Sequence, residues 1–222
     1  MNKALQYLLA STLAATSAYA TADDFGVELV WNTTDAEEVL KVLPEQKDEF
    51  HKLVKKGEIK DMFLVKSNID GKPAQLLKFV ITGNSEKEVT EKLHRLPMYE
   101  KELVKIHKIQ NLGAKWLDNT PVYNNYGVTF TWKEEIEPLE IDRVLGIDLQ
   151  RVISLNQAGL VTSAYINTQK MSNGVERPIY SVAFLAKDAQ HARELSKQFE
   201  SVNLGYASID VQYLGHKVNI TD

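Results

Sequence analysis

The segment Phe25–Trp31 reads FGVELVW, and it returns 101 residues later as YGVTFTW at Tyr126–Trp132. An aromatic residue, Gly and Val open both copies, and an apolar residue and Trp follow at matching places. Both copies alternate apolar residues with others, which is the period of a half-buried β-strand. The sequence therefore predicts two copies of one unit, each opening on such a strand.

The match continues along the chain in the same order. Leu53 and Gly57 correspond to Leu155 and Gly159, 102 residues later. The offset changes by one residue in the loops, as a duplicated fold allows. Each copy reads as strand, helix, strand, strand, helix, strand, with a helix interruption expected near Pro44. The last strands are expected at 102–109 and 206–214.

This order of elements is typical of the ferredoxin-like α+β unit, an antiparallel sheet with both helices on one face. We therefore predict an α+β protein with two tandem ferredoxin-like β-α-β-β-α-β domains, at 21–117 and 126–222. A linker at 118–125, rich in Asn, Asp and Pro, joins them.

Residues 1–20 have the pattern of a secretory signal peptide. A short basic start precedes an apolar run, and Ala18–Ala20 has the small-x-small pattern of a signal-peptidase site. The apolar run is shorter than the about 20 residues of a stable membrane-spanning helix. We expect export, cleavage near Thr21 and a periplasmic or secreted mature protein that is not held in the membrane. An uncleaved anchor is the alternative.

The cysteine count and the charge exclude several classes of function. The chain has no cysteine, which removes thiolate metal sites and cysteine nucleophiles, and favours a periplasm-like compartment over a harsher external one. Loss of residues 1–20 removes Lys3 and no acidic residue, so the net charge moves from −4 to −5. A mildly acidic chain without a basic block is a poor candidate for binding nucleic acid or an anionic membrane.

The end of the first copy resembles a known family. Leu93–Tyr99 reads LHRLPMY, and VKI follows at Val104–Ile106. These motifs resemble the second helix and last strand of muconolactone-isomerase-like proteins, which belong to the dimeric α+β barrel superfamily. The second copy departs from the family pattern, because SVNL at Ser201–Leu204 replaces the Leu-Pro element.

This resemblance implies that two such domains pair sheet against sheet and close a barrel. The physical reason is that helices cover only one face of each sheet, so the other face needs a partner. Here the partner is the second copy, and the chain is expected to be a monomer containing an intramolecular pseudo-dimer. The superfamily includes isomerases, monooxygenases, haem-handling enzymes and proteins without known chemistry, so the fold does not select an activity.

Strand alternation indicates which side chains face the space between the sheets. If Val104 and Ile106 pack under the helices, Lys105 and His107 point toward the opposite sheet. A carboxylate, lysines and an imidazole gathered there could transfer a proton, and His107 with Glu28 are the candidate catalytic residues. The candidate ligand-binding residues are Lys78, Lys105, Thr129, Asp210, Trp31 and Trp132. The alternative is that these residues have structural roles only: Glu28 forms an ion pair with a lysine, His107 faces solvent, and both tryptophans belong to the core.

No metal site and no cofactor are predicted. The chain has no His-x-His and no His-Glu-x-x-His pattern. A single histidine could ligate haem, as in some members of the superfamily, but no local signature marks one.

Three functions remain open. The first is an exported protein that binds a small, partly apolar molecule between its sheets. The second is a cofactor-independent isomerase or monooxygenase-like enzyme, and the third is a non-catalytic module that docks on another envelope protein. A filled and dry space between the sheets would favour the third.

Overall fold

The computed structural model describes residues 22–118 and 124–220. The predicted signal peptide lies outside these residues, as do residues 119–123 of the predicted linker. The described residues form eight strands and six helices, which confirms the α+β class. No described helix is long and apolar enough to cross a membrane.

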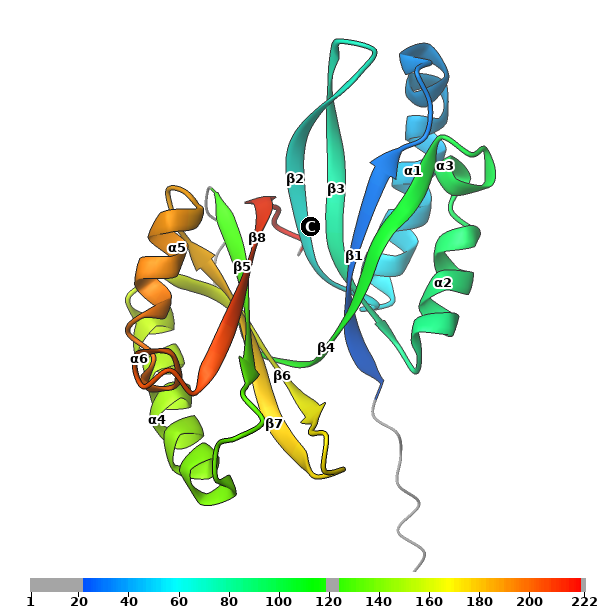
Figure 1. Ribbon diagram of the computed structural model, residues 1–222. Coiled ribbons are helices and arrows are strands. Elements are labelled where there is room, and N and C mark those ends of the chain that lie inside the picture. The colour runs from blue at the N-terminus through cyan, green and yellow to red at the C-terminus, as the bar shows by residue number, and fades with distance from the viewer. Residues whose placement is uncertain (1–21, 119–123, 221–222) are drawn as a thin grey trace, which may run out of the picture.

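The two halves of the chain have the same order of elements, and each places two short helices after its third strand (Figure 1). The first half contains β1 (Asp23–Trp31), α1 (Ala36–Lys55), β2 (Ile59–Ile69), β3 (Lys72–Gly83), α2 (Glu86–His94), α3 (Pro97–Glu100) and β4 (Val104–Asp118). The second half contains β5 (Asn125–Trp132), α4 (Pro138–Gln157), β6 (Val161–Lys170), β7 (Glu176–Leu185), α5 (Ala189–Ser196), α6 (Glu200–Asn203) and β8 (Ala207–Lys217).

Local sequence explains where the helices begin. Asp35, Ser85 and Asp188 are N-cap residues whose side chains accept hydrogen bonds from backbone amides of the first turn. Helix α1 continues through Pro44, where the sequence predicted an interruption. Pro44 is exposed, whereas Val42 and Phe50 of the same helix are buried, and their packing outweighs the lost backbone hydrogen bond.

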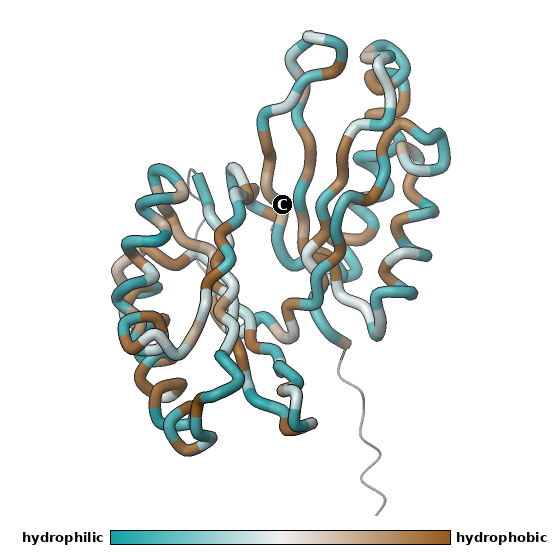
Figure 2. The backbone as a smooth tube through the Cα atoms, in the orientation of Figure 1, coloured by the Kyte–Doolittle hydropathy of each residue, from teal (hydrophilic) through white to brown (hydrophobic). Residues whose placement is uncertain are grey.

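The strands close into one barrel in the order β1-β3-β2-β8-β5-β7-β6-β4. Neighbouring strands run antiparallel throughout, and the helices of each half cover the outer face of that half's sheet (Figure 1). Apolar residues alternate with hydrophilic ones along the strands, as Figure 2 shows. Each half therefore has its own core between helices and sheet, centred on Phe79 and Ile81 in the first and on Phe130 and Phe184 in the second.

The last strand of each half crosses from its own sheet to the other one. β4 pairs with β1 as far as Gly113 and with β6 from Ala114, while β8 pairs with β5 as far as Gly215 and with β2 from His216. Both glycines have positive φ, +73° and +97°. A Cβ at Gly113 would lie 1.8 Å from the Ile166 carbonyl oxygen, and one at Gly215 would lie 2.4 Å from that of Leu64. Only glycine fits these crossing points. The predicted strand ends at 109 and 214 fall short of them.

Beyond the crossing points, four charged side chains hold the two halves together. Lys115 Nζ lies 3.1 Å from Asp61 and 2.6 Å from Asp118, and Lys217 Nζ lies 3.0 Å and 2.6 Å from the same two carboxylates. Lys217 also donates to Ser163 Oγ at 2.7 Å. This four-charge cluster joins β2, β4 and β8 with no net charge, so the buried Asp61 and Lys217 are both compensated.

Candidate functional site

A partly enclosed cavity of about 70 Å³ lies between the two sheets. All eight strands contribute to its lining, and we call it the inter-sheet cavity. Its walls are apolar at Phe63, Leu112, Tyr165 and Leu214. Its polar lining residues are Glu28, Lys78, Lys108, Gln110, Thr129, Ser181, Asp210 and Gln212.

Most of these polar residues form two matching rows, one in each sheet. In the first sheet Glu28 lies directly opposite Lys78 on β3 and Lys108 on β4, and we call these three the charged row. In the second sheet Thr129 lies opposite Ser181 on β7 and Asp210 on β8, which form the polar row. Phe63 extends the charged row and Tyr165 extends the polar row.

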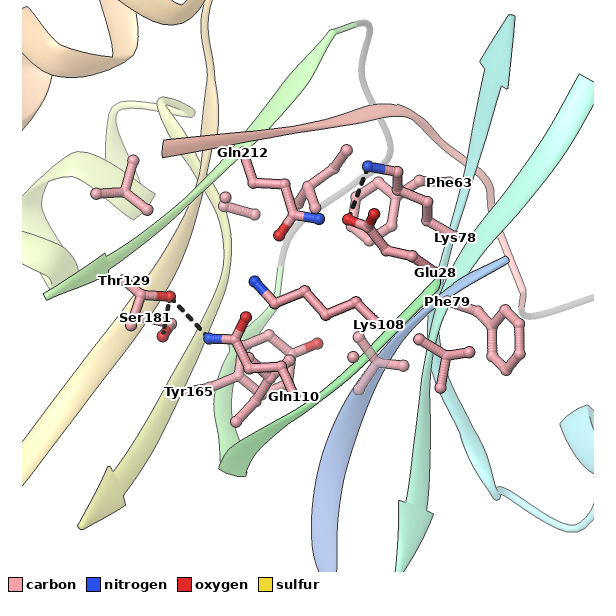
Figure 3. A pocket seen from close by; sticks show the side chains of 18 of the residues that line it. Glu28, Phe63, Lys78, Phe79, Lys108, Gln110, Thr129, Tyr165, Ser181 and Gln212 are labelled. Atoms are coloured by element: carbon pink, nitrogen blue, oxygen red, sulfur yellow. Dashed lines mark hydrogen bonds and ion pairs between the residues drawn. The ribbon is translucent and has the colours of Figure 1, made fainter. Parts of the chain in front are cut away.

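Some of the polar side chains that line the cavity are hydrogen-bonded to neighbouring residues, and Lys108 is not. Lys78 Nζ donates to Glu28 Oε1 at 2.9 Å and to the Tyr213 carbonyl oxygen at 2.7 Å. Thr129 Oγ1 accepts from Gln110 Nε2 at 3.2 Å and from Ser181 Oγ at 3.1 Å. Lys108 and Gln212 extend into the space between the sheets, as Figure 3 shows. The Lys108 ammonium makes no hydrogen bond or ion pair with any described residue.

The ring of Tyr165 forms part of one wall of the cavity, and its hydroxyl is hydrogen-bonded behind that wall. The hydroxyl donates to the Asp61 carboxylate of the four-charge cluster. Burial raises the pKa of Tyr165 well above its ordinary value, and the Asp61 charge adds to this. Tyr165 is therefore a neutral, positioned side chain.

The structure brings together four of the sequence-predicted site residues: Glu28, Lys78, Thr129 and Asp210 all line the cavity. It does not bring Lys105 or His107 to them. A bulge in β4 places Ile106 opposite Leu29 and Lys108 opposite Glu28, so His107 is the extra residue and is exposed. Lys105 lies opposite Val30, also exposed and outside the lining.

The bulge puts Lys108 and Gln110 where alternation placed Lys105 and His107, and sequence reasoning missed both residues. One signal could have found them. Gln110 and Gln212 are 102 residues apart, as are Lys108 and Asp210, which is the same offset as between Leu53 and Leu155.

The two tryptophans lie outside the cavity lining. Trp132 is buried in a small core with Ile141 and Val144, and its Nε1 donates to the Pro178 carbonyl oxygen at 2.7 Å. Trp31 packs against the first core, and its buried Nε1 has no hydrogen-bond partner among the described residues.

No family model and no curated protein sequence matches this chain. Solved structures match its fold. A haem-binding protein from Thermus thermophilus has a TM-score of 0.56 at 11% identity, covering 90% of this chain and 92% of its own. A mutant chlorite dismutase from Candidatus Nitrospira defluvii has a TM-score of 0.56 at 9% identity, with coverage of 90% and 92%. A candidate chlorite dismutase has a TM-score of 0.56 at 6% identity, with coverage of 91% and 97%.

At these identities the likeness shows the fold, which is chlorite dismutase-like and agrees with the dimeric α+β barrel superfamily expected from the sequence. It also corrects the expectation of no cofactor. That expectation is overturned by the haem-binding protein from Thermus thermophilus, which shares this fold.

The inter-sheet cavity by itself does not fit a haem. Drug-sized ligands occupy clefts of roughly 300–1,000 Å³, well above the cavity volume of about 70 Å³. None of the described residues that line it is a histidine, and the hydroxyl of Tyr165, the one tyrosine in the lining, donates to Asp61 behind the wall. The chain shares its fold with a haem-binding protein, whereas the inter-sheet cavity is suited to a ligand smaller than haem.

Proposed function

We propose that this chain is an exported protein that binds a small, partly apolar molecule in the inter-sheet cavity. The observation that carries the proposal is the pair of facing rows. Each row brings hydrogen-bonding groups to the cavity, and the charged row adds the Lys108 ammonium, which is exposed to solvent and has no partner among the described residues. A ligand in the cavity could form hydrogen bonds or an ion pair with these groups.

The other two functions have less support from this geometry. A proton-transfer enzyme built on His107 and Glu28 would need both residues at one place, and the β4 bulge separates His107 from the cavity. An interaction module with a filled, dry interior would leave no cavity between the sheets.

Haem binding is a second candidate, favoured by the fold shared with the Thermus thermophilus protein. On this chain a haem would use a site other than the inter-sheet cavity. Bound haem would give an absorption band in the haem region. A substitution that fills the inter-sheet cavity would leave this band unchanged.

Tandem duplication of a ferredoxin-like unit is also part of the proposal. Support comes from glycines with the same role in each half: Gly113 and Gly215 at the crossing points, and Gly26 and Gly127 under Leu112 and Leu214. Barrel closure within one chain supports a monomer.

The test is to purify the protein from an exporting host and to measure its mass under native and denaturing conditions, with an absorption spectrum. Ser181→Leu fills the cavity, and Ser154→Leu makes the same change on an exposed position of α4. We expect a small molecule that is lost on denaturation, retained by Ser154→Leu and absent from Ser181→Leu. A bound molecule that Ser181→Leu retains would contradict the proposed location, and a mass that includes residues 1–20 would contradict signal cleavage.

A further inference from the structure

The two rows carry opposite charge toward the same cavity. The charged row contains Lys108, Glu28 and Lys78, which sum to +1, and the polar row contains one charged residue, Asp210, and sums to −1. Each wall therefore presents one charge that its own row does not neutralise.

These two remaining charges are Lys108 and Asp210, which both line the cavity and are both exposed to solvent. Lys78 is satisfied by Glu28 and by the Tyr213 carbonyl oxygen, which leaves Lys108 as the available cation of its wall. Asp210 makes no hydrogen bond or ion pair with any described residue, and no ion pair joins it to Lys108. They lie on β4 and β8 at positions 102 residues apart, so the pseudo-symmetry of the barrel places them on opposite walls.

Charge balance selects the ligand. A small monoanion would pair with Lys108 and leave Asp210 facing another negative charge. A small cation would pair with Asp210 and leave Lys108 facing another positive charge. A ligand with one positive and one negative group matches both walls and keeps the net charge of the cavity at zero.

The size of the cavity limits the ligand further. At roughly 15 Å³ of such space for each water, about 70 Å³ holds about five waters. That is the size of the smallest amino acids. Gln212, which lines the same cavity as Lys108, can add a hydrogen bond to a carboxylate.

We propose that the inter-sheet cavity binds a small zwitterion of the amino-acid type, with its carboxylate at Lys108 and its ammonium at Asp210. The proposal rests on the proposed function, because it names the ligand class of the same cavity.

The experiment is calorimetric titration of the mature protein with glycine, acetate and methylammonium. Glycine is expected to bind at least tenfold more tightly than either single-charge probe. Lys108→Met and Asp210→Asn are each expected to weaken glycine binding at least tenfold. Lys105→Met is the matched control, since Lys105 is an exposed lysine of the same strand outside the cavity lining, and it should leave binding unchanged. Circular dichroism melts verify that each variant is folded.

The double variant Lys108→Asp/Asp210→Lys exchanges the two charges. It should bind glycine in the reversed orientation, within tenfold of the wild type, whereas Lys108→Asp alone should not bind it. Acetate binding that equals glycine binding and is unaffected by Asp210→Asn would overturn the inference in favour of an anion site.

A second result separates this inference from the proposed function. If glycine does not bind and the molecule that co-purifies with the protein is lost from Ser181→Leu, the zwitterion inference is wrong and the cavity remains the binding site. If glycine does not bind and Ser181→Leu changes nothing, both are wrong.

Discussion

Gln46 in α1 and Asp148 in α4 lie 102 residues apart and have the same role in the two halves. Gln46 Oε1 accepts a hydrogen bond from the Met98 amide at the start of α3, at 2.9 Å. Asp148 accepts from the Glu200 amide at the start of α6 at 2.6 Å, and also from the Ser201 amide and the Tyr180 hydroxyl. The backbone of each half thus requires an acceptor at this place, and either a neutral or a charged group meets the requirement.

The two rows of the cavity differ more widely. Lys108, Glu28 and Lys78 in one half correspond to Asp210, Thr129 and Ser181 in the other, although the strands that carry them pair in the same way. Packing under the helices constrains the outer faces of the sheets to apolar residues in both halves. The cavity face is where the halves diverge chemically, whereas the crossing points, the helix acceptors and the tryptophans occupy matching places in both halves.

The largest effect is expected at the crossing points, where the halves should behave alike. Gly113→Ala and Gly215→Ala place a Cβ inside contact distance of a backbone carbonyl, so each should lower the free energy of unfolding by at least about 4 kcal/mol or prevent folding. Urea unfolding measures this. Gly71→Ala is the control: its φ of +76° matches that of Gly113, but nothing lies within 4 Å of the added Cβ, so it should cost only about 1–2 kcal/mol. Equal losses at Gly71 and Gly113 would show that backbone strain, and not the clash, decides.

The second effect should differ between the halves. Asp148→Ala leaves two buried donors and one half-buried donor without this acceptor, and about 3 kcal/mol of stability should be lost. Gln46→Ala leaves one, at a cost of about 1 kcal/mol. Equal urea midpoints for the two variants would contradict the comparison of Gln46 with Asp148.

The matching tryptophans should also differ. Trp132→Phe removes a hydrogen bond to Pro178, so a loss of about 1 kcal/mol is expected in thermal unfolding. Trp31→Phe removes a buried N–H that has no partner among the described residues, so the protein should be unchanged or more stable. A larger loss for Trp31→Phe would mean that its N–H has a partner in solution.

The smallest effect concerns pH and the four-charge cluster. Burial raises the pKa of Asp118, but hydrogen bonds from Lys115 and Lys217 outweigh it and hold the pKa below the ordinary value. Because the folded pKa is lowered, the stabilisation is present above the ordinary Asp pKa and is lost as pH falls through the folded value. Wild type should therefore lose about 0.5 kcal/mol more than Asp118→Asn between about pH 7 and about pH 3, a small value because the side chain is half exposed. Asp142→Asn, which removes an exposed carboxylate of α4 outside the four-charge cluster, is the matched control for the loss of one negative charge.

Sequence patterns predicted the order of the elements because alternation and turn residues are local properties. The crossing of β4 and β8 was missed, since pairing beyond Gly113 and Gly215 depends on strands from the other half of the chain. The bulge at His107 was missed for a related reason: no Gly or Pro marks it, and a shift of one residue turns every later side chain of β4 to the opposite face. Glu28, Lys78, Thr129 and Asp210 were placed correctly because the alternation of their strands is unbroken up to those positions.

The unequal lengths of the two crossing segments have a consequence for biosynthesis. β4 makes four pairings with β6, whereas β8 makes only two with β2, and β8 follows the other seven described strands in the chain. Until it arrives, β2 and β5 each present an unpaired edge, and such edges accept any suitable strand. A nascent molecule can then take the final strand of a neighbour in place of its own, which yields an exchanged dimer with the same contacts. High expression levels will favour that exchange, and the brevity of the β2–β8 pairing sets how readily it is undone.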